Sequence, residues 1–258
     1  MNLIIQQKFE MLYSHFKKHI PERKSRFGRP ESCNNSAFMG IMHILITGSQ
    51  WKYLPINYGS KSAVHRKFMK WIKMGVFTEF FESLKKQYLK KQEITNWSAI
   101  DTSHKKAPFG KFAGKNPTDR SKRGVKFVLV VDRKGVPLLL DVAASNTHDS
   151  KLFIPILEHI EPFERTMIIA ADGAFDDQKL RDFAKTKNII LLASTNPRRN
   201  KNRHIERPRH RWIIERTFGI FSWFRGIRTC YNKSKESYLS FLQIVSAIRL
   251  LKEVTLLG

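Results

Sequence analysis

The spacing of the apolar residues changes near residue 92, and this change limits the folds open to the chain. From Leu3 to about Leu89 they recur at three- and four-residue steps, which predicts amphipathic helices. Beyond Gln92, short apolar runs alternate with turn residues, which predicts strands joined by turns and helices. We therefore expect a small all-helical domain over residues 1–92 and a mixed α/β domain over residues 93–258.

The helical part contains two well-marked helices, expected over residues 36–47 and 61–74. Ser60 stands where it can cap the second helix, and Gly75 where it can end it. The pair resembles a helix-turn-helix, so the second helix is a candidate DNA-binding element. Its expected buried stripe is Val64, Phe68, Trp71 and Ile72.

The outer faces of the second helix are basic, with spacings that suit a DNA groove or a row of phosphates. A solvated basic face without a partner is the alternative explanation of the same pattern. The candidate DNA-binding residues on this helix are Arg66, Lys67, Lys70 and Lys73.

The second domain is expected to hold a mixed sheet flanked by helices. The Asp-Arg-Lys-Gly turn at 132–135 predicts a hairpin, and the basic stretch 104–123 is expected to be an exposed loop. The expected strands cover residues 97–101, 125–131, 136–142, 166–171 and 189–193, and the expected helices cover 149–160, 176–187, 207–224 and 238–251.

The charge of the chain predicts a polyanionic partner. It carries 47 Lys plus Arg against 22 Asp plus Glu, a net +25, which favours DNA or RNA. An anionic membrane surface is the rival partner, but no apolar run approaches the ~18 residues of a membrane span. The first ten residues lack a signal-peptide pattern, so a cytoplasmic location is expected, at the nucleoid when DNA is bound. Cys33 and Cys230 lack the spacing of zinc ligands and are expected to be reduced thiols.

Two aspartates follow apolar strands and are candidate metal ligands. Asp101 ends the 97–101 run, and Asp172 ends the 166–171 run, with Gly173 next to allow a sharp turn. Phosphodiester chemistry with two divalent metals requires carboxylates that converge from different elements. In the expected sheet these two strands can lie side by side with both acids at the same end.

Glu215 is the third candidate, because it stands in the middle of an expected helix among apolar residues. Burying an unpaired carboxylate there would cost several kcal/mol, so a metal or an arginine must compensate. A salt bridge to Arg211, one helical turn earlier, is an alternative that the sequence leaves open.

Other polar and aromatic residues have simpler structural explanations. Asp132 suits a turn, and Asp149, Asp176 and Asp177 suit helix N-termini, whereas the role of Asp141 near a strand end stays open. Zinc ligation by histidine is not expected, since no histidine has a ligand-like spacing with the cysteines. The tryptophans expected in the core are Trp51, Trp71 and Trp212.

Several ordered motifs together resemble the DDE transposases of the insertion sequence 5 family. The glutamate motif of that family matches at Arg211 and Glu215, while Pro208 stands where the family has tyrosine and Ser222 where it has lysine; Arg225 is the nearest later cation. The matching stretches are Gly-Arg-Pro at 28–30, Thr-Gly-Ser-Gln-Trp-Lys-Tyr-Leu-Pro at 47–55, Ile-Asp-Thr-Ser at 100–103, Lys-Arg-Gly at 122–124, Thr-His-Asp-Ser at 147–150, Ala-Asp-Gly-Ala-Phe-Asp at 171–176 and Arg-His-Arg-Trp-Ile-Ile-Glu-Arg-Thr-Phe at 209–218.

The resemblance implies a ribonuclease H-like catalytic domain and a specific chemistry. Asp101, Asp172 and Glu215 would bind two Mg²⁺ ions, with Mn²⁺ able to substitute. DNA would be hydrolysed at the element ends, and the freed 3'-hydroxyl joined to target DNA, with double-stranded DNA as partner and a homodimer or higher multimer as the acting form. A DNA-binding protein derived from a transposase but without catalysis is the alternative, and a structural RNA-binding protein ranks behind both.

The resemblance also assigns DNA backbone contacts to the basic run that precedes the glutamate helix. Within it, Arg211 would contact the scissile phosphate or hold Glu215. The expected DNA-binding residues of the run are Arg198, Arg199, Lys201, Arg203, Arg207, Arg209 and Arg211.

Overall fold

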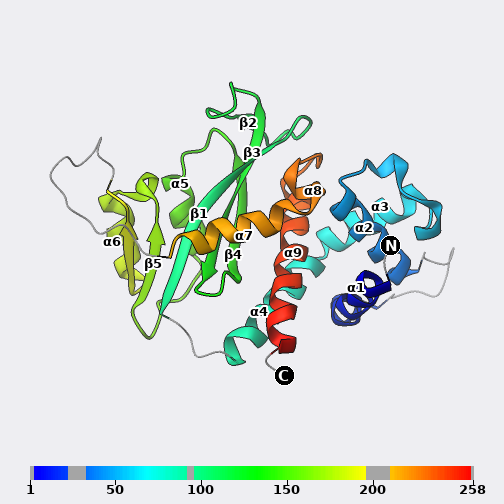
Figure 1. Ribbon diagram of the computed structural model, residues 1–258, viewed down its shortest axis with the longest axis horizontal. Helices are drawn as coiled ribbons and strands as arrows, with labels where there is room; N and C mark the ends of the chain where they lie inside the picture. The colour runs from blue at the N-terminus through cyan, green and yellow to red at the C-terminus, as the bar shows by residue number, and fades with distance from the viewer. Residues whose placement is uncertain (1–2, 23–32, 92–95, 196–209, 257–258) are drawn as a thin grey trace.

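A six-stranded mixed sheet forms the centre of the protein in the computed structural model, which describes residues 3–22, 33–91, 96–195 and 210–256 (Figure 1). The strand order is β2-β3-β1-β5-β6, and β4 pairs with the far side of β3. β3 runs antiparallel to β1 and β4, while β5 and β6 run parallel to β1, which is the ribonuclease H-like arrangement expected from the sequence. The strands are β1 Trp97–Lys106, β2 Gly114–Lys115, β3 Arg123–Asp132, β4 Pro137–Ala144, β5 Met167–Ala171 and β6 Ile189–Ala193.

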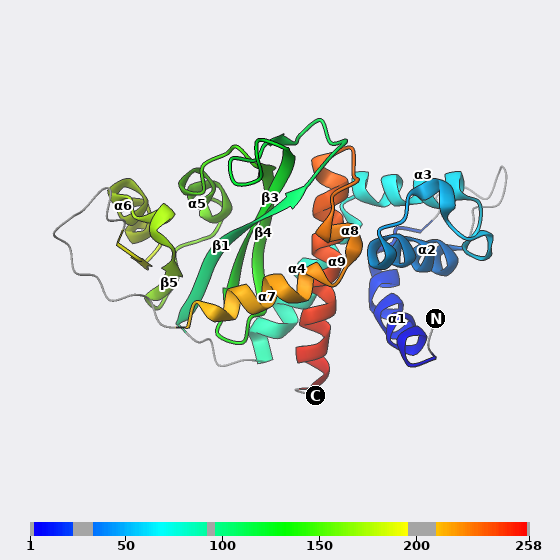
Figure 2. The same cartoon turned by 45° about the horizontal axis from the view of Figure 1, so that its top comes forward.

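Helices cover both faces of the sheet, because alternate strand residues point to opposite sides. Ile100 and Val128 pack on one side with the helices α5 (Ser150–Leu157) and α6 (Gln178–Thr186). Ala99 and Phe127 pack on the other side with α7 (Trp212–Ser222) and α9 (Lys235–Leu256). Figure 2 shows α7 crossing this face toward the short helix α8 (Arg225–Arg228).

The N-terminal part is helical, as the apolar spacing predicts. Ser60 Oγ accepts the Ala63 N–H at 3.3 Å and caps α3, and Gly75 follows it with φ +74°, so both expected helix signals are confirmed. The elements are α1 Leu3–Phe16, η1 Lys17–His19, α2 Asn34–Thr47, η2 Trp51–Tyr53, η3 Ile56–Tyr58, α3 Lys61–Lys73 and α4 Val76–Lys91.

The N-terminal helices share one hydrophobic core with the α7 and α9 face of the sheet. α4 packs along α9, and the Phe68 ring of α3 lies 5.4 Å from the Phe241 ring of α9, centroid to centroid. The same core cluster reaches Phe127 and Leu129 of β3. The domain boundary at residue 92 stays a prediction.

The expected loop over residues 104–123 is partly wrong. β1 continues through His104 to Lys106 and pairs with β3, and the two-residue strand β2 follows. The polar run His104-Lys105-Lys106 lacks the apolar alternation that predicts a strand. It is nevertheless a strand, because it pairs with β3, whose side chains there are buried.

The two cysteines of the chain differ in burial. Cys33 is exposed and Cys230 is buried, and both are free thiols; burial raises the pKa of Cys230 to about 12. Within the described ranges, none of the helices combines the length and the apolar character that crossing a lipid bilayer requires.

Candidate active site

Two aspartates meet where β5 ends beside β1. Ala99 of β1 pairs with Ala170 of β5, so two residues farther along these parallel strands Asp101 and Asp172 reach the same level and the same face. Asp172 Oδ1 accepts the Ala174 N–H at 2.9 Å, which begins the turn Gly173–Phe175. Asp101 lies inside β1 rather than at its end, because β1 continues against β3 after β5 has stopped.

Asp101 is held by two donors and stands close to a second negative charge. Its Oδ1 accepts the Thr102 N–H at 2.7 Å, and its Oδ2 accepts Nη2 of Arg211 at 3.1 Å. Burial raises the pKa of Asp101 to about 6, and the charge of Asp172 acts in the same direction, against the two hydrogen bonds. The pair therefore resists carrying two negative charges, as carboxylates do at a site where a cation would stabilise both.

Glu215 lies in the first turn of α7 and is exposed, so the expectation of a buried carboxylate is wrong. α7 buries Ile213, Ile214 and Thr217 on the sheet, and Glu215 projects from the other side of the helix. The alternative salt bridge to Arg211 is not found between these described side chains, because Arg211 pairs with Asp101. Among the described residues, no three acidic, histidine or cysteine side chains converge closely enough to hold a metal ion.

Asp149 has a different role from the helix cap that its position predicts. It precedes α5, but its side chain makes no capping hydrogen bond. Its Oδ1 instead accepts the Thr102 hydroxyl at 2.9 Å and Nζ of the buried Lys126 at 2.6 Å. Sequence reasoning missed this network because Lys126 lies 23 residues earlier, inside an apolar strand.

Four further aspartates have structural partners. Asp132 Oδ1 accepts the turn N–H groups of Lys134 at 2.9 Å and Val136 at 2.8 Å, which confirms its turn role. Asp177 accepts the Lys179 N–H at 2.8 Å and caps α6, as expected. The ion pairs are Asp176 with Arg181 and Asp141 with Lys235.

The basic face of α3 is smaller than the sequence predicts. Lys67 is buried and its Nζ donates to Asn34 Oδ1 at 2.6 Å, so its expected place on an outer face is wrong. Position 67 lies three residues after Val64 and four before Trp71, which puts it beside the buried stripe. The other three DNA-binding candidates of this helix are exposed: Arg66, Lys70 and Lys73.

The basic run that precedes the glutamate helix is described in part. Arg211 is described and binds Asp101, at the N-terminus of α7. The other candidates, Arg198, Arg199, Lys201, Arg203, Arg207 and Arg209, lie outside the described residues, as does Pro208.

Ser222, near the end of α7, stands where the motif has its lysine, and an ammonium group from β1 lies beside it. The hydroxyl of Ser222 accepts a hydrogen bond from Nζ of Lys105 at 3.1 Å.

The core assignment of Trp212 is wrong: this side chain is 56% exposed, and the Arg216 guanidinium lies over its ring at 5.1 Å. Trp71 is buried as expected, and Trp51 is half-buried.

Comparisons with known proteins place this chain in a family. The family model described as "Transposase DDE domain" matches residues 94–249, and the model described as "Putative transposase of IS4/5 family" matches residues 9–81. The "Putative transposase for insertion sequence element IS402" of Burkholderia cepacia is 25% identical over 139 residues, which cover 51% of this chain and 64% of that protein. The chain thus matches less than two thirds of that relative's length.

Solved structures of transposases show weaker likeness. The match to a piggyBac transposase synaptic complex with hairpin DNA has a TM-score of 0.49 at 10% identity. It covers 94% of this chain and 71% of the piggyBac chain. The match to a Mos1 transposase paired-end complex has a TM-score of 0.27 at 13% identity, and it covers 96% of this chain and 86% of the Mos1 chain. These scores are low, so the assignment rests on the sequence match, which takes in Asp101, Asp172 and Glu215 and covers more than half of the chain. The chain belongs to the family of transposase DDE domains.

Proposed function

We propose that this protein is a transposase that hydrolyses DNA at the ends of an insertion element and joins the freed 3'-hydroxyl to target DNA. The observation that carries the proposal is the meeting of Asp101 and Asp172 at the end of β5, in a chain of this family with a net charge of +25. The two strands fix both carboxylates on a rigid sheet, which is the preorganisation that metal-dependent phosphoryl transfer requires.

The donor set fits a divalent cation of the hard, oxygen-binding kind. Asp101 and Asp172 offer carboxylate oxygens. Burial is the main cause that raises the pKa of Asp101 and the charge of Asp172 adds to it, and Mg²⁺ or Mn²⁺ would offset both effects by stabilising the two carboxylates. Glu215 is the third proposed ligand, since it stands four residues, about 6 Å along the helix, after the arginine that binds Asp101. Bound there, two ions supply activation of a water or a 3'-hydroxyl and stabilisation of the leaving oxygen.

The residues of the chain have distinct tasks in this proposal. Arg211 holds the Asp101 carboxylate in place through its 3.1 Å hydrogen bond, and it fixes the N-terminus of α7 beside β1. Arg66, Lys70 and Lys73 bind phosphates from α3, together with the basic residues of 198–209. Since transposition holds two element ends together, we propose a homodimer or higher multimer on double-stranded DNA.

Cleavage and strand transfer with a labelled element-end duplex test the proposal. We expect nicked and joined products with Mg²⁺ or Mn²⁺, no products with EDTA, and a loss of at least about 10³-fold with Asp172→Asn, which removes a proposed metal ligand. Asp182→Asn is the matched control, because Asp182 is an exposed acid on α6 paired with Lys185. Its activity should equal that of the parent.

The same cleavage assay distinguishes an active transposase from the alternative, a DNA-binding protein without catalysis. A protein that binds element-end DNA tightly but gives no nicking with either metal would be a DNA-binding protein without catalysis. Parent and Asp172→Asn would then bind Mn²⁺ equally weakly, measured directly by calorimetry. Retained nicking by Asp172→Asn would remove Asp172 from the site.

A further inference from the structure

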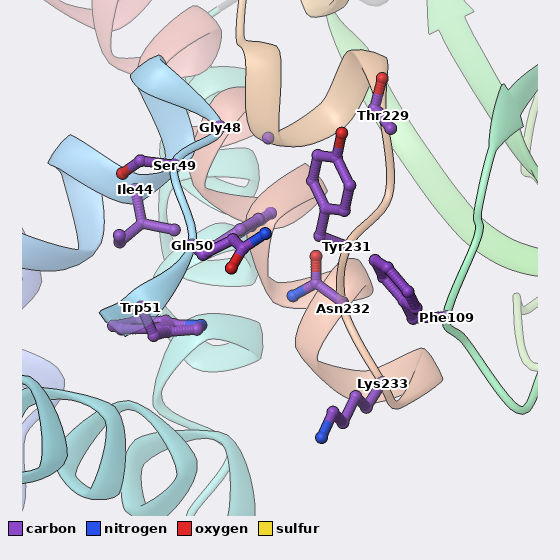
Figure 3. Close-up of a pocket in the computed structure, with 12 residues that line it drawn as sticks. Ile44, Gly48, Ser49, Gln50, Trp51, Phe109, Thr229, Tyr231, Asn232 and Lys233 are labelled. Carbon is purple, nitrogen blue, oxygen red and sulfur yellow. The ribbon is translucent and has the colours of Figure 1, made fainter. Parts of the chain in front are cut away.

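A pocket of about 340 Å³ lies where the N-terminal helices meet the segment after α8 (Figure 3). Ser49, Gln50 and Trp51 form one wall, directly after α2. Tyr231 and Asn232 form the other, with Phe109 from the segment between β1 and β2. This junction pocket contains none of the three candidate carboxylates, and it is lined by Gly48–Trp51 of the 47–55 motif, which the proposed chemistry does not use.

The junction pocket combines flat aromatic rings with free amide groups. The rings of Phe109 and Tyr231 are 62% and 44% exposed and stand 6.2 Å apart at 33°. The side chains of Gln50 and Asn232 face each other across the space in Figure 3, and neither amide hydrogen-bonds to another residue that the structure describes. Exposed rings stack on nucleobases, and amides pair with the donor and acceptor atoms on base edges.

The charge around the junction pocket favours a polyanion. Three of the four segments that line it, 44–53, 105–116 and 223–233, contain no Asp or Glu, although the whole chain has 22 of these against 47 Lys and Arg. The fourth is α9, which contributes the apolar side chain of Phe241 and carries Glu236 in its first turn. A nucleic acid strand entering the pocket would therefore meet no repelling carboxylate from the first three segments. The cations of the three segments are Lys52, Lys105, Lys106, Lys111, Lys115, Arg225, Arg228 and Lys233.

The junction pocket lies within reach of DNA bound at the carboxylates. β1 continues from Asp101 to its last residue, Lys106, and the backbone of Lys106 forms a β-bridge with Thr229 on the pocket wall. Five residues of extended strand span about 17 Å, which is half of one helical turn of DNA. α7 makes the same connection, since it starts directly after Arg211, which binds Asp101, and leads into α8.

We propose that the junction pocket holds an unpaired nucleobase of the DNA bound at Asp101 and Asp172, stacked on Tyr231 and Phe109. Gln50 and Asn232 would pair with its edge, and Lys233 would neutralise an adjacent phosphate. This inference rests on the proposed function, because it takes its ligand from the DNA bound for cleavage.

Three fluorescent DNAs of one sequence test it by anisotropy in EDTA: a paired duplex, one with an unpaired adenine, and one with an abasic residue in its place. We expect the parent to bind the adenine bulge about tenfold more tightly than the other two, which corresponds to one stacked base. Tyr231→Ala should abolish this preference. Tyr53→Ala is the matched control, since Tyr53 is 66% exposed and outside the pocket, and it should keep the preference.

Equal binding of the adenine and abasic bulges by the parent would overturn the inference, as would an unchanged preference in Tyr231→Ala. Competition by micromolar AMP would also overturn it, in favour of a free nucleotide site; no competition at that concentration is expected. The two proposals fail separately. Absent nicking with an intact bulge preference rejects the catalysis, whereas normal nicking without the preference rejects the pocket assignment.

Discussion

The carboxylate of Asp149 neutralises the buried ammonium group of Lys126. Removing this carboxylate should therefore destabilise the fold. The Lys126 side chain is 4% exposed, and its Nζ lies 2.6 Å from Asp149 Oδ1. Removing one partner of a buried pair leaves an uncompensated charge and costs about 3–5 kcal/mol. We therefore expect Asp149→Ala to lower the free energy of unfolding by about that amount, measured by urea denaturation.

Two further variants separate charge from packing at Asp149. Asp149→Leu combined with Lys126→Met removes both charges, so it should recover most of the lost stability. Asp182→Ala breaks the exposed pair with Lys185, at 3.6 Å, and should change stability by less than about 1 kcal/mol. If the double variant were as unstable as Asp149→Ala, the loss would come from packing rather than from the unpaired ammonium.

The residues that sequence reasoning placed wrongly share one cause. Lys67, Trp212 and Glu215 all lie on helices whose existence was predicted, but the side that each helix buries depends on its partner. α7 begins at Trp212, so its buried stripe falls on Ile213 and Thr217, and Trp212 faces outward. Local spacing thus predicts that a helix forms, whereas its rotation is set by contacts distant in sequence.

At the scale of elements, the close packing of α8 on α2 depends on Gly226. A Cβ at this position would stand 2.9 Å from the Leu45 carbonyl oxygen and 3.1 Å from the Leu45 Cα, both backbone atoms. Because backbone cannot move aside as a side chain can, Gly226→Ala should force the two helices apart and cost about 1–3 kcal/mol. The measurement is the midpoint and slope of a urea unfolding curve.

Gly219 of α7 provides the matched control for this substitution. A Cβ there meets nothing within 4 Å, so Gly219→Ala introduces no clash. Alanine also has the higher helix propensity, and a gain of up to about 1 kcal/mol is expected. Equal effects at both positions would show that helix propensity, and not the α2–α8 contact, decides the outcome.

Most elements could be predicted because their local signals agree with their final places. The 132–135 turn, the β5 and β6 runs and the Ser60 cap were found from sequence, and so was the meeting of Asp101 with Asp172. β1 beyond Asp101 could not be predicted, because its own residues there are polar and its pairing partner β3 carries the apolar side chains. The Lys126–Asp149 pair was also missed, because its two residues lie 23 positions apart and come from different elements.

At the scale of the whole molecule, the shared core connects the N-terminal helices to the central sheet. Phe68 of α3 touches Phe241 of α9, and α9 packs on β4 and belongs to the cluster that includes Phe127 of β3. A chain with two independent domains would let one unfold while the other stayed protected. A chain with one continuous core unfolds as a single cooperative unit.

Hydrogen exchange can distinguish these two behaviours through Phe68→Ala. Truncating a buried phenylalanine costs about 3–5 kcal/mol. If the core is continuous, the slowest amides of β1 and β3 should lose protection by the same free energy as those of α3, because both exchange through the same global opening. Tyr53→Ala, on an exposed side chain of the N-terminal part, should leave all of them unchanged. Lost protection in α3 with unchanged protection in β1 and β3 would instead support two units that unfold separately, and the boundary near residue 92 would then mark a thermodynamic as well as a compositional division.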